Sequence, residues 1–254
     1  MRRLSRVTVM KLALSAVLLT ATACLAGWWL LWSEDPLIGA DVSGFPVRGA
    51  DISAHNGDVD FRLLRDNGGI GFVLIKSTEG AQWQDRNFRR NFHRARRAGL
   101  KVGAYHFFRF DVDPALQALN VMDALRGLEP DLPVAIDVEE WTNPEGIPHD
   151  TVAARVVAMA ETLGRRGIRT LVYTNKKGYS RIISKIPPEK TLDLWLCSLS
   201  ADVPEHPFVI WQYTHRGKIE GLEGRFDLNV FAGDSAGWRT WLRASPFRTD
   251  DRLN

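Results

Sequence analysis

Eight short apolar runs recur along the chain, and they constrain the fold more than any other feature of the sequence. Most of them are continuously apolar, as expected for strands that are buried on both faces of a sheet. So many buried strands in a chain of 254 residues predict a sheet closed into a barrel. The runs span residues 47–53, 71–78, 101–108, 133–139, 169–174, 192–199, 208–214 and 226–231.

Amphipathic segments separate the earlier strands. Asp113 and Asp150 are suitable N-caps for two of these segments, and Gly99 and Gly127 follow the ends of two. The alternation of strands with helices implies a parallel sheet. Residues 200–207 are too few for a helical crossover, which needs about a dozen. We therefore expect the end of the barrel to lack helices and to contain one antiparallel strand. The expected helices span residues 60–66, 85–98, 114–126, 151–166 and 176–184.

The N-terminus carries an uncharged run at residues 12–32, long enough for a helix to span the roughly 30 Å core of a bilayer. Cations precede this run and acids follow it, so the positive-inside rule places the N-terminus in the cytoplasm and the rest outside. Two alternatives stay open, namely cleavage near Ala21-Thr22-Ala23 and lipid modification of Cys24. The expected organisation is a transmembrane anchor in a bacterial inner membrane at residues 1–33, a linker at 34–46, a barrel on the periplasmic or extracellular side at 47–242, and a tail at 243–254.

The basic character of the chain belongs to this N-terminal segment. The chain has 33 lysines and arginines against 30 acids, but four of these cations lie in residues 1–33, which contain no acid. The remainder is nearly neutral, which argues against nucleic acid as a partner. Cys24 and Cys197 make neither a disulfide framework nor a CxxC zinc motif. The sequence also lacks the P-loop, HExxH and GxSxG motifs.

Four acidic residues lie at or near predicted strand ends, where parallel barrels carry their sites: Asp51, Asp137, Glu139 and Asp227. Asp137 and Glu139 are two residues apart on one strand, so their side chains share a face, with Cα atoms about 6.5–7 Å apart. Like charges this close, facing an apolar interior, raise the pKa of one carboxyl group. A glycosidic oxygen needs such a proton donor. The alternative is that both acids meet only water or an arginine.

Aromatic residues gather at the same strand ends. Rings with polar edges suit the faces of sugars, and the alternative for each ring is ordinary core packing. Glu140 points to the face opposite Glu139, so we expect it to be structural. His106 and His215 are expected to be hydrogen-bonded core or rim groups. The aromatic residues are Tyr105, Trp141, Tyr173, Trp195, Trp211 and Tyr213.

Eight motifs, taken in order, resemble those of glycoside hydrolase family 25, the muramidases of the Chalaropsis-type lysozyme class. The resemblance covers residues 47–242. It departs from the family's usual pattern at residues 53–57, where a Gln-Gly after a hydrophobic residue is common and this chain reads SAHNG. The motifs are GADIS (49–53), FVLIKSTEG (72–80), GAYHFF (103–108), AIDVE (135–139), LVYTN (171–175), LWLCSL (194–199), IWQYT (210–214) and FDLNVF (226–231).

The resemblance implies a modified TIM-like α/β barrel of five strand–helix units and three further strands. It implies hydrolysis of the β-1,4 bond between N-acetylmuramic acid and N-acetylglucosamine in peptidoglycan. Glu139 corresponds to the proton donor, Asp137 to its assisting carboxylate, and Asp51 and Asp227 to further acids of the cleft. Two routes stay open for Asp137: it attacks the anomeric carbon directly, or it orients the substrate's own acetamido group toward that carbon.

No metal or organic cofactor is implied, and we expect a monomeric catalytic domain whose partners are glycan strands and, through its N-terminal helix, the membrane. The alternatives are a catalytically inactive peptidoglycan-binding scaffold and a chitinase-like hydrolase. Residues implied by the resemblance, together with the strand-end aromatics, form the expected substrate-binding set: Tyr105, Trp141, Tyr173, Trp195, Gln212 and Tyr213.

Overall fold

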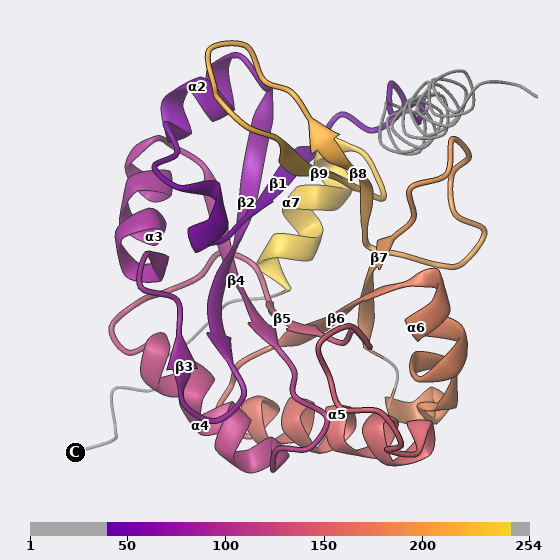
Figure 1. Ribbon diagram of the computed structural model, residues 1–254. Helices are drawn as coiled ribbons and strands as arrows, with labels where there is room; N and C mark the ends of the chain where they lie inside the picture. The colour runs from indigo at the N-terminus through magenta and orange to yellow at the C-terminus, as the bar shows by residue number, and fades with distance from the viewer. Residues whose placement is uncertain (1–39, 191, 245–254) are drawn as a thin grey trace, which may run out of the picture. The chain divides into compact units, whose positions relative to one another are not determined.

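The computed structural model describes residues 40–190 and 192–244, which form an α/β domain around a closed barrel (Figure 1). Eight strands follow one another in the order β1-β9-β8-β7-β6-β5-β4-β2, and pairing of β2 with β1 closes the ring. The short strand β3 pairs only with β2. The strands are β1 (Arg48–Ile52), β2 (Ile70–Glu79), β3 (Trp83–Gln84), β4 (Lys101–Phe107), β5 (Val134–Asp137), β6 (Thr170–Asn175), β7 (Asp193–Cys197), β8 (Ile210–Gly217) and β9 (Phe226–Phe231).

The direction of the strands confirms the expectation for the end of the barrel. Strand β9 is antiparallel to both of its neighbours, β8 and β1, whereas the other neighbours in the ring are parallel. No helix lies between β7 and β8. All eight predicted strands are present, and the barrel is therefore mixed rather than wholly parallel.

Each of the first five barrel strands is followed by a helix, and these helices lie outside the strands (Figure 1). Asp113 caps its helix as predicted, because its carboxylate accepts from the backbone N–H groups of Ala115 and Leu116. The prediction that Asp150 is an N-cap is wrong. That helix begins at His149, two residues before the predicted start, and Asp150 lies in its first turn, where a negative charge suits the helix dipole. The helices are α2 (Phe61–Asp66), α3 (Phe88–Arg97), α4 (Pro114–Ala124), α5 (His149–Gly164) and α6 (Lys176–Arg181).

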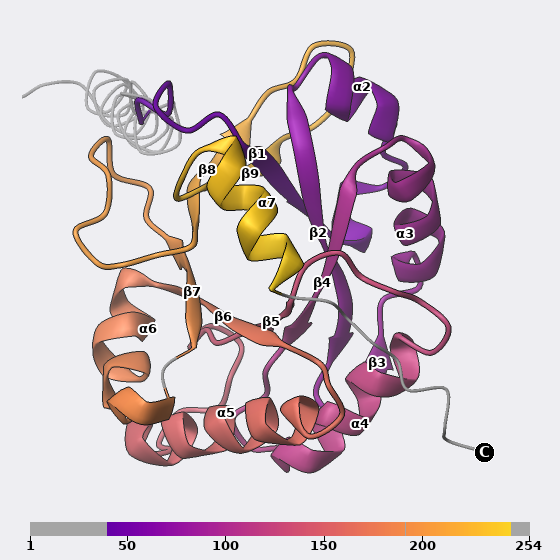
Figure 2. The ribbon, with the colours of Figure 1, turned by 180° about the vertical axis from the view of Figure 1, so that it is seen from behind.

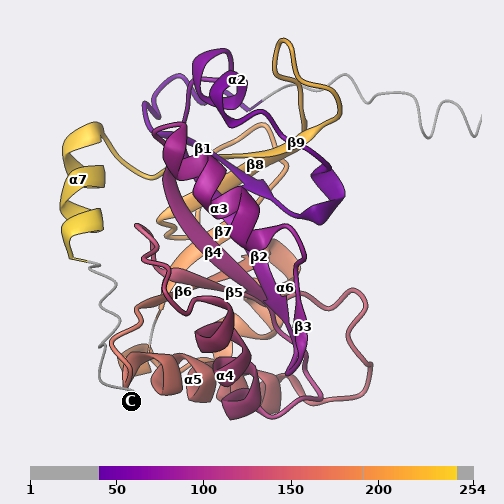
Figure 3. The same cartoon turned by 90° about the vertical axis from the view of Figure 1, so that its left-hand side faces the viewer.

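A further helix, α7 (Ser235–Arg243), follows β9 and was not expected from the sequence. Its buried Trp238 packs on Phe72 at the start of β2 and on Phe231 at the end of β9, with ring centroids 5.0 and 5.1 Å apart. Figure 2 shows α7 in front of the strands, and Figure 3 shows it apart from helices α2 to α5. Helix α7 therefore covers the end of the barrel at which the parallel strands begin.

The barrel interior has its own apolar cluster, separate from the larger one between strands and outer helices. Close packing there requires a glycine at position 49, because a Cβ atom would lie 2.2 Å from the ring of Phe72. The interior cluster is concentrated toward α7, which leaves the opposite opening to polar side chains. Its buried members are Phe72, Leu74, Leu132, Ala135, Leu171, Trp195, Ile210, Phe231 and Trp238.

The predicted membrane segment at residues 12–32 lies outside the described residues. Within residues 40–190 and 192–244, no helix combines the length and the apolar character needed to cross a bilayer.

Candidate active site

The four predicted acids lie on the inner face of the barrel, at the opening away from α7. Asp137 follows Ala135 of the interior cluster by two residues, so both side chains point inward. Asp51 and Asp227 are direct partners across the antiparallel β1–β9 ladder. Asp227 lies four residues before the interior residue Phe231, so their side chains share the inner face of β9. Glu139 follows Asp137 by two residues just beyond β5. The structure therefore brings the acids of three separate strands to one opening.

Asp51 and Asp227 form a carboxyl pair. Asn229 donates from Nδ2 to Asp51 Oδ2 at 2.9 Å, and the indole of Trp195 donates to Asn229 Oδ1 at 2.7 Å. Burial raises the pKa of Asp51 well above its usual value, and the neighbouring charge of Asp227 raises it further. Burial also raises the pKa of Asp227, while its hydrogen bond with Asp51 acts the other way. The pair therefore favours a shared proton.

Asp137 is nearly buried and has an unused acceptor. Burial raises its pKa well above the usual value, and the charge of Glu139 adds to this rise. Its Oδ1 atom has no hydrogen-bond partner within the described residues. A buried acceptor without a partner carries a desolvation cost, which a ligand that donates a hydrogen bond would relieve.

Glu139 is partly exposed at the same opening. The indole nitrogen of Trp141 donates to its Oε2 at 2.7 Å, and the side chain of Asn143 donates to its backbone carbonyl at 2.8 Å. Burial raises the pKa of Glu139, and hydrogen bonds from Trp141 and Asn175 offset part of that rise. This carboxyl group therefore holds its proton to a higher pH than an exposed glutamate, as a general acid must.

Several of the predicted substrate-binding residues meet beside these acids. The Tyr173 hydroxyl donates to Gln212 Oε1 at 2.6 Å, and the Tyr173 ring lies 4.5 Å from that of Trp195. Tyr105 also contacts Trp195, with ring centroids 6.4 Å apart. Trp141 is 65% exposed and leaves most of its ring open beside Glu139. Tyr105, Trp141, Tyr173 and Gln212 therefore border the same opening.

Trp195 and Tyr213 are placed differently. Trp195 is only 2% exposed, so the structure gives it the role of packing on the two tyrosines and holding Asn229. Tyr213 lies at an irregularity in the β8–β9 pairing and packs on the buried Trp211, with centroids 6.0 Å apart. It is on the side of β8 away from Gln212, and the structure does not bring it to the acids.

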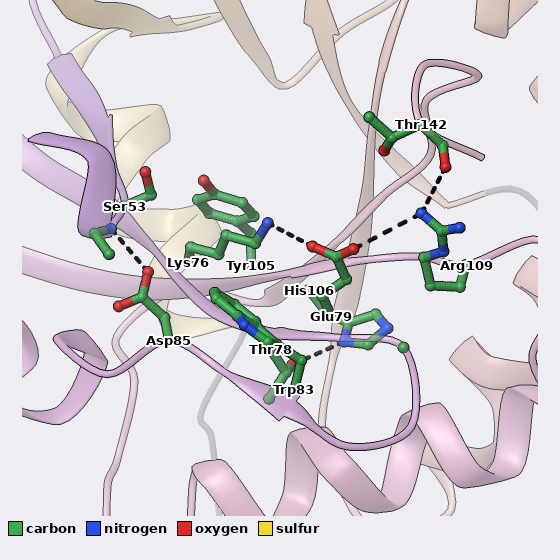
Figure 4. A network of polar contacts seen from close by, with 12 residues as sticks. Ser53, Lys76, Thr78, Glu79, Trp83, Asp85, Tyr105, His106, Arg109 and Thr142 are labelled. Atoms are coloured by element: carbon green, nitrogen blue, oxygen red, sulfur yellow. Dashed lines mark hydrogen bonds and ion pairs between the residues drawn. The ribbon is translucent and has the colours of Figure 1, made fainter.

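Sequence reasoning missed the charged residues of β2. Lys76 points into the site and forms an ion pair with Glu79, with Nζ 2.9 Å from Oε2 (Figure 4). Its ammonium group also lies 4.9 Å from the Trp83 ring centre and 5.0 Å from that of Phe107. The positive charge of Lys76 lowers the pKa of Asp137 and Glu139 against the effect of burial. Its position two residues after the interior Leu74 was the available signal.

Two further predictions about polar residues are confirmed. His106 is buried between Thr78 and Gln117, and burial lowers its pKa to about 4, so it is a neutral core group. Glu140 faces outward and pairs with Lys177, Arg181 and His149, which lower its pKa to about 2.

Within the described residues, no group of three or more His, Cys, Asp and Glu side chains is arranged to hold a metal ion. The site therefore offers carboxyl groups of raised pKa, tyrosine hydroxyls and an open indole ring. This arrangement can donate a proton and accept hydrogen bonds from a polar ligand.

Comparisons with known proteins identify the family of the chain. Residues 50–222 match the family model for glycosyl hydrolases family 25. An autolytic lysozyme of Clostridium acetobutylicum is 31% identical over 188 residues, which are 73% of this chain and 56% of that protein. Lysozyme M1 of Streptomyces globisporus is 27% identical over 226 residues, covering 78% of this chain and 71% of the relative.

A solved structure shows the same fold. The family 25 glycosyl hydrolase from Bacillus anthracis superimposes with a TM-score of 0.71 and 30% identity, covering 80% of this chain and 96% of the other. The chain spans about half the length of the clostridial lysozyme. From the matched family model, the shared fold and the lysozyme relatives, this chain belongs to family 25 of the glycosyl hydrolases.

Proposed function

We propose that the protein is a peptidoglycan hydrolase that cleaves the β-1,4 bond between N-acetylmuramic acid and N-acetylglucosamine. The observation that carries the proposal is the inward-facing pair of Asp137 and Glu139, both with raised pKa, at the open end of the barrel. None of the ion pairs among the described residues involves either carboxyl group, which argues against a purely structural role. The lysozyme relatives supply the choice of substrate.

Glu139 acts first as general acid on the leaving oxygen and then as general base toward water. Asp137 has two routes to assist. Its unpartnered Oδ1 favours the route in which it accepts a hydrogen bond from the substrate's acetamido N–H and orients that group toward the anomeric carbon. The pair of Asp51 and Asp227, which shares a proton, adds one negative charge that stabilises a positively charged transition state.

The exposed ring of Trp141 and the hydroxyl of Tyr173 are suited to bind sugars next to Glu139. Gln212 fixes the orientation of Tyr173, and Tyr105 borders the acids from β4. Binding of glycan strands along these residues needs no cofactor in the proposed reaction.

The proposal includes export of the barrel and its retention at the inner membrane by residues 12–32. The uncharged length of this segment and the cations before it support the assignment. Fractionation of cells tests it. Recovery of the full chain with the inner membrane supports the anchor, and recovery in the cytoplasmic fraction alone contradicts it.

Substitution of the acid tests the reaction directly. Glu139→Gln keeps the size of the side chain but loses the transferable proton, so release of reducing ends from purified sacculi should fall by a factor of about 10²–10⁴. Glu145→Gln is the matched control, because it makes the same change at an exposed position nearby. Circular dichroism and melting establish that both variants fold.

Equal activity of Glu139→Gln and the unaltered chain would remove Glu139 from the role of general acid. Binding of the unaltered chain to sacculi without any release of reducing ends would instead favour an inactive scaffold. Comparable release from chitin would favour a chitinase-like enzyme.

A further inference from the structure

The loop that carries the proposed acid is clamped by one buried side chain. Asn143 donates to the carbonyl oxygens of Glu139 (2.8 Å) and Phe108 (3.0 Å), and it accepts from the N–H of Phe110 (2.8 Å). Between the two ends of this loop, Trp141 places its indole nitrogen 2.7 Å from Glu139 Oε2. The orientation of the indole therefore depends on the backbone between residues 139 and 143.

That backbone contains a strained residue. Thr142 has a φ of 60°, and it is the one non-glycine residue with positive φ in the described part of the chain. A left-handed conformation is unfavourable for a β-branched residue and persists only where its surroundings hold it. The side chain of Arg109 provides such a contact, because its Nη1 donates to the Thr142 carbonyl oxygen at 2.7 Å (Figure 4).

Arg109 is itself fixed in place. Its backbone N–H donates to Oε1 of the buried Gln117 at 2.8 Å, and its carbonyl accepts from Nε2 of the same residue at 2.9 Å. Its alkyl stem passes over Gly80, where a Cβ atom would lie 3.0 Å from Arg109 Cγ. The guanidinium lies farther from the carboxylates of Glu79 (3.8 Å) and Asp111 (3.9 Å) than from Thr142. These contacts direct the guanidinium at the loop.

We propose that Arg109 is a positioning residue for the Glu139 carboxyl group, and that it acts through the Thr142 carbonyl and the Trp141 indole. The proposal rests on the proposed function, because that function makes Glu139 the proton donor. Arg109 holds Thr142 in its strained conformation, which keeps the indole N–H on Glu139. The residue thus tunes the acid from the preceding strand–helix unit, β4 and α4, without contacting the substrate.

The indole has a defined effect on the acid. Its N–H stabilises the charged carboxylate, so it lowers the pKa of Glu139 while burial raises it. If the loop relaxes and the indole turns away, the pKa of Glu139 rises. Other groups also face Glu139, and Arg109 is linked to one of them, Lys76, through Glu79, which lies 3.8 Å from Arg109 and 2.9 Å from Lys76. The groups are Lys76 on β2, Asp137 on β5, Tyr173 and Asn175 on β6, Cys197 on β7 and Asp227 on β9.

The decisive variant is Arg109→Met in the full chain, because methionine keeps the stem over Gly80 and loses every side-chain donor. Carboxyl ¹³C NMR, assigned with Glu139→Gln, measures the pKa of Glu139, and ¹⁵N NMR follows the indole N–H of Trp141. We expect the pKa to rise and the indole signal to lose its hydrogen-bonded shift. The alkaline limb of the pH–kcat profile should move to higher pH, with kcat about tenfold lower and KM little changed.

Three comparison variants make the test specific. Trp141→Phe should raise the pKa of Glu139 by the same amount as Arg109→Met, and the double variant should add nothing further. Arg109→Lys restores one donor and should return the pKa toward its original value. Arg181→Ala removes an arginine from the outer side of the same loop, where Glu140 keeps Lys177 and His149, and should leave the pKa of Glu139 unchanged.

An unchanged Glu139 pKa and indole signal in a folded Arg109→Met variant would overturn the proposal, as would additive shifts in the double variant. The NMR readouts do not require turnover. A chain that releases no sugar would therefore refute the proposed function, while the coupling between Arg109 and Glu139 would still be measured.

Discussion

At the scale of single residues, the site is a set of four carboxyl groups whose pKa values are raised, mainly by burial. The period of two along a strand predicted that Asp137 and Glu139 share a face, and the structure places both inward. The same rule, applied to Asp227, would have found Asn229. The contact of Arg109 with Thr142 was out of reach, because it joins two loops whose distance in space depends on the finished barrel. The contact of Lys76 with Trp83 depends on the local pairing of β2 with β3, and β3 was not expected from the sequence.

Asp51 offers a test of the electrostatic cost of this site. An asparagine there can still accept from Asn229 and can donate to Asp227, so Asp51→Asn should fold normally. The folded-state pKa of Asp51 is raised, so its protonated form favours folding. Stability falls as pH rises above the unfolded value of about 3.8. We expect Asp51→Asn to be more stable than the unaltered chain at pH 7 and equally stable at pH 3, as measured by urea unfolding.

Asp58 supplies the comparison of opposite sign. It is exposed and pairs with Arg94, which lowers its pKa, so its contribution to stability is present above pH 3.8 and lost at lower pH. Asp58→Asn should therefore give no gain at pH 7. An equal increase in the free energy of unfolding of the two variants at pH 7 would contradict this account of the site. So would an increase for Asp51→Asn that persists at pH 3.

At the scale of elements, the strands were predictable and the last helix was not. The eight strands can be recognised in the sequence as apolar runs, because both of their faces are buried. Helix α7 carries few apolar residues and a glycine in its first turn, so local pattern alone does not mark it. Its position depends on the packing of Trp238 against Phe72 and Phe231. These two phenylalanines are more than 150 residues apart in the sequence but lie at the same end of the barrel.

Helix α7 should contribute measurably to stability. Trp238→Ala removes a large buried side chain from the interior cluster, so the free energy of unfolding should fall by about 3–5 kcal/mol. Leu119→Ala on α4 is the control, because Leu119 is 55% exposed and its removal should cost less than about 0.5 kcal/mol. Denaturant unfolding measures both. Equal stability of the two variants would mean that α7 does not close the barrel.

At the scale of the whole molecule, the two ends of the barrel have different tasks. One end is filled by apolar side chains and covered by α7, whereas the other gathers acids, tyrosines and an exposed indole. The resemblance in the sequence implied this barrel, and the closed mixed ring agrees with it. The segment at residues 12–32 lies outside the described residues, and anchoring of the barrel at a membrane remains a proposal.

The chemical identity of the released ends tests the central claim most directly. Purified sacculi are digested with the full chain, and the soluble fragments are analysed by mass spectrometry before and after borohydride reduction. The account predicts muropeptides that end in a reducing N-acetylmuramic acid, and at least about a hundredfold less of them from the Glu139→Gln variant. Fragments that end in reducing N-acetylglucosamine, or the same fragments from both proteins, would contradict it.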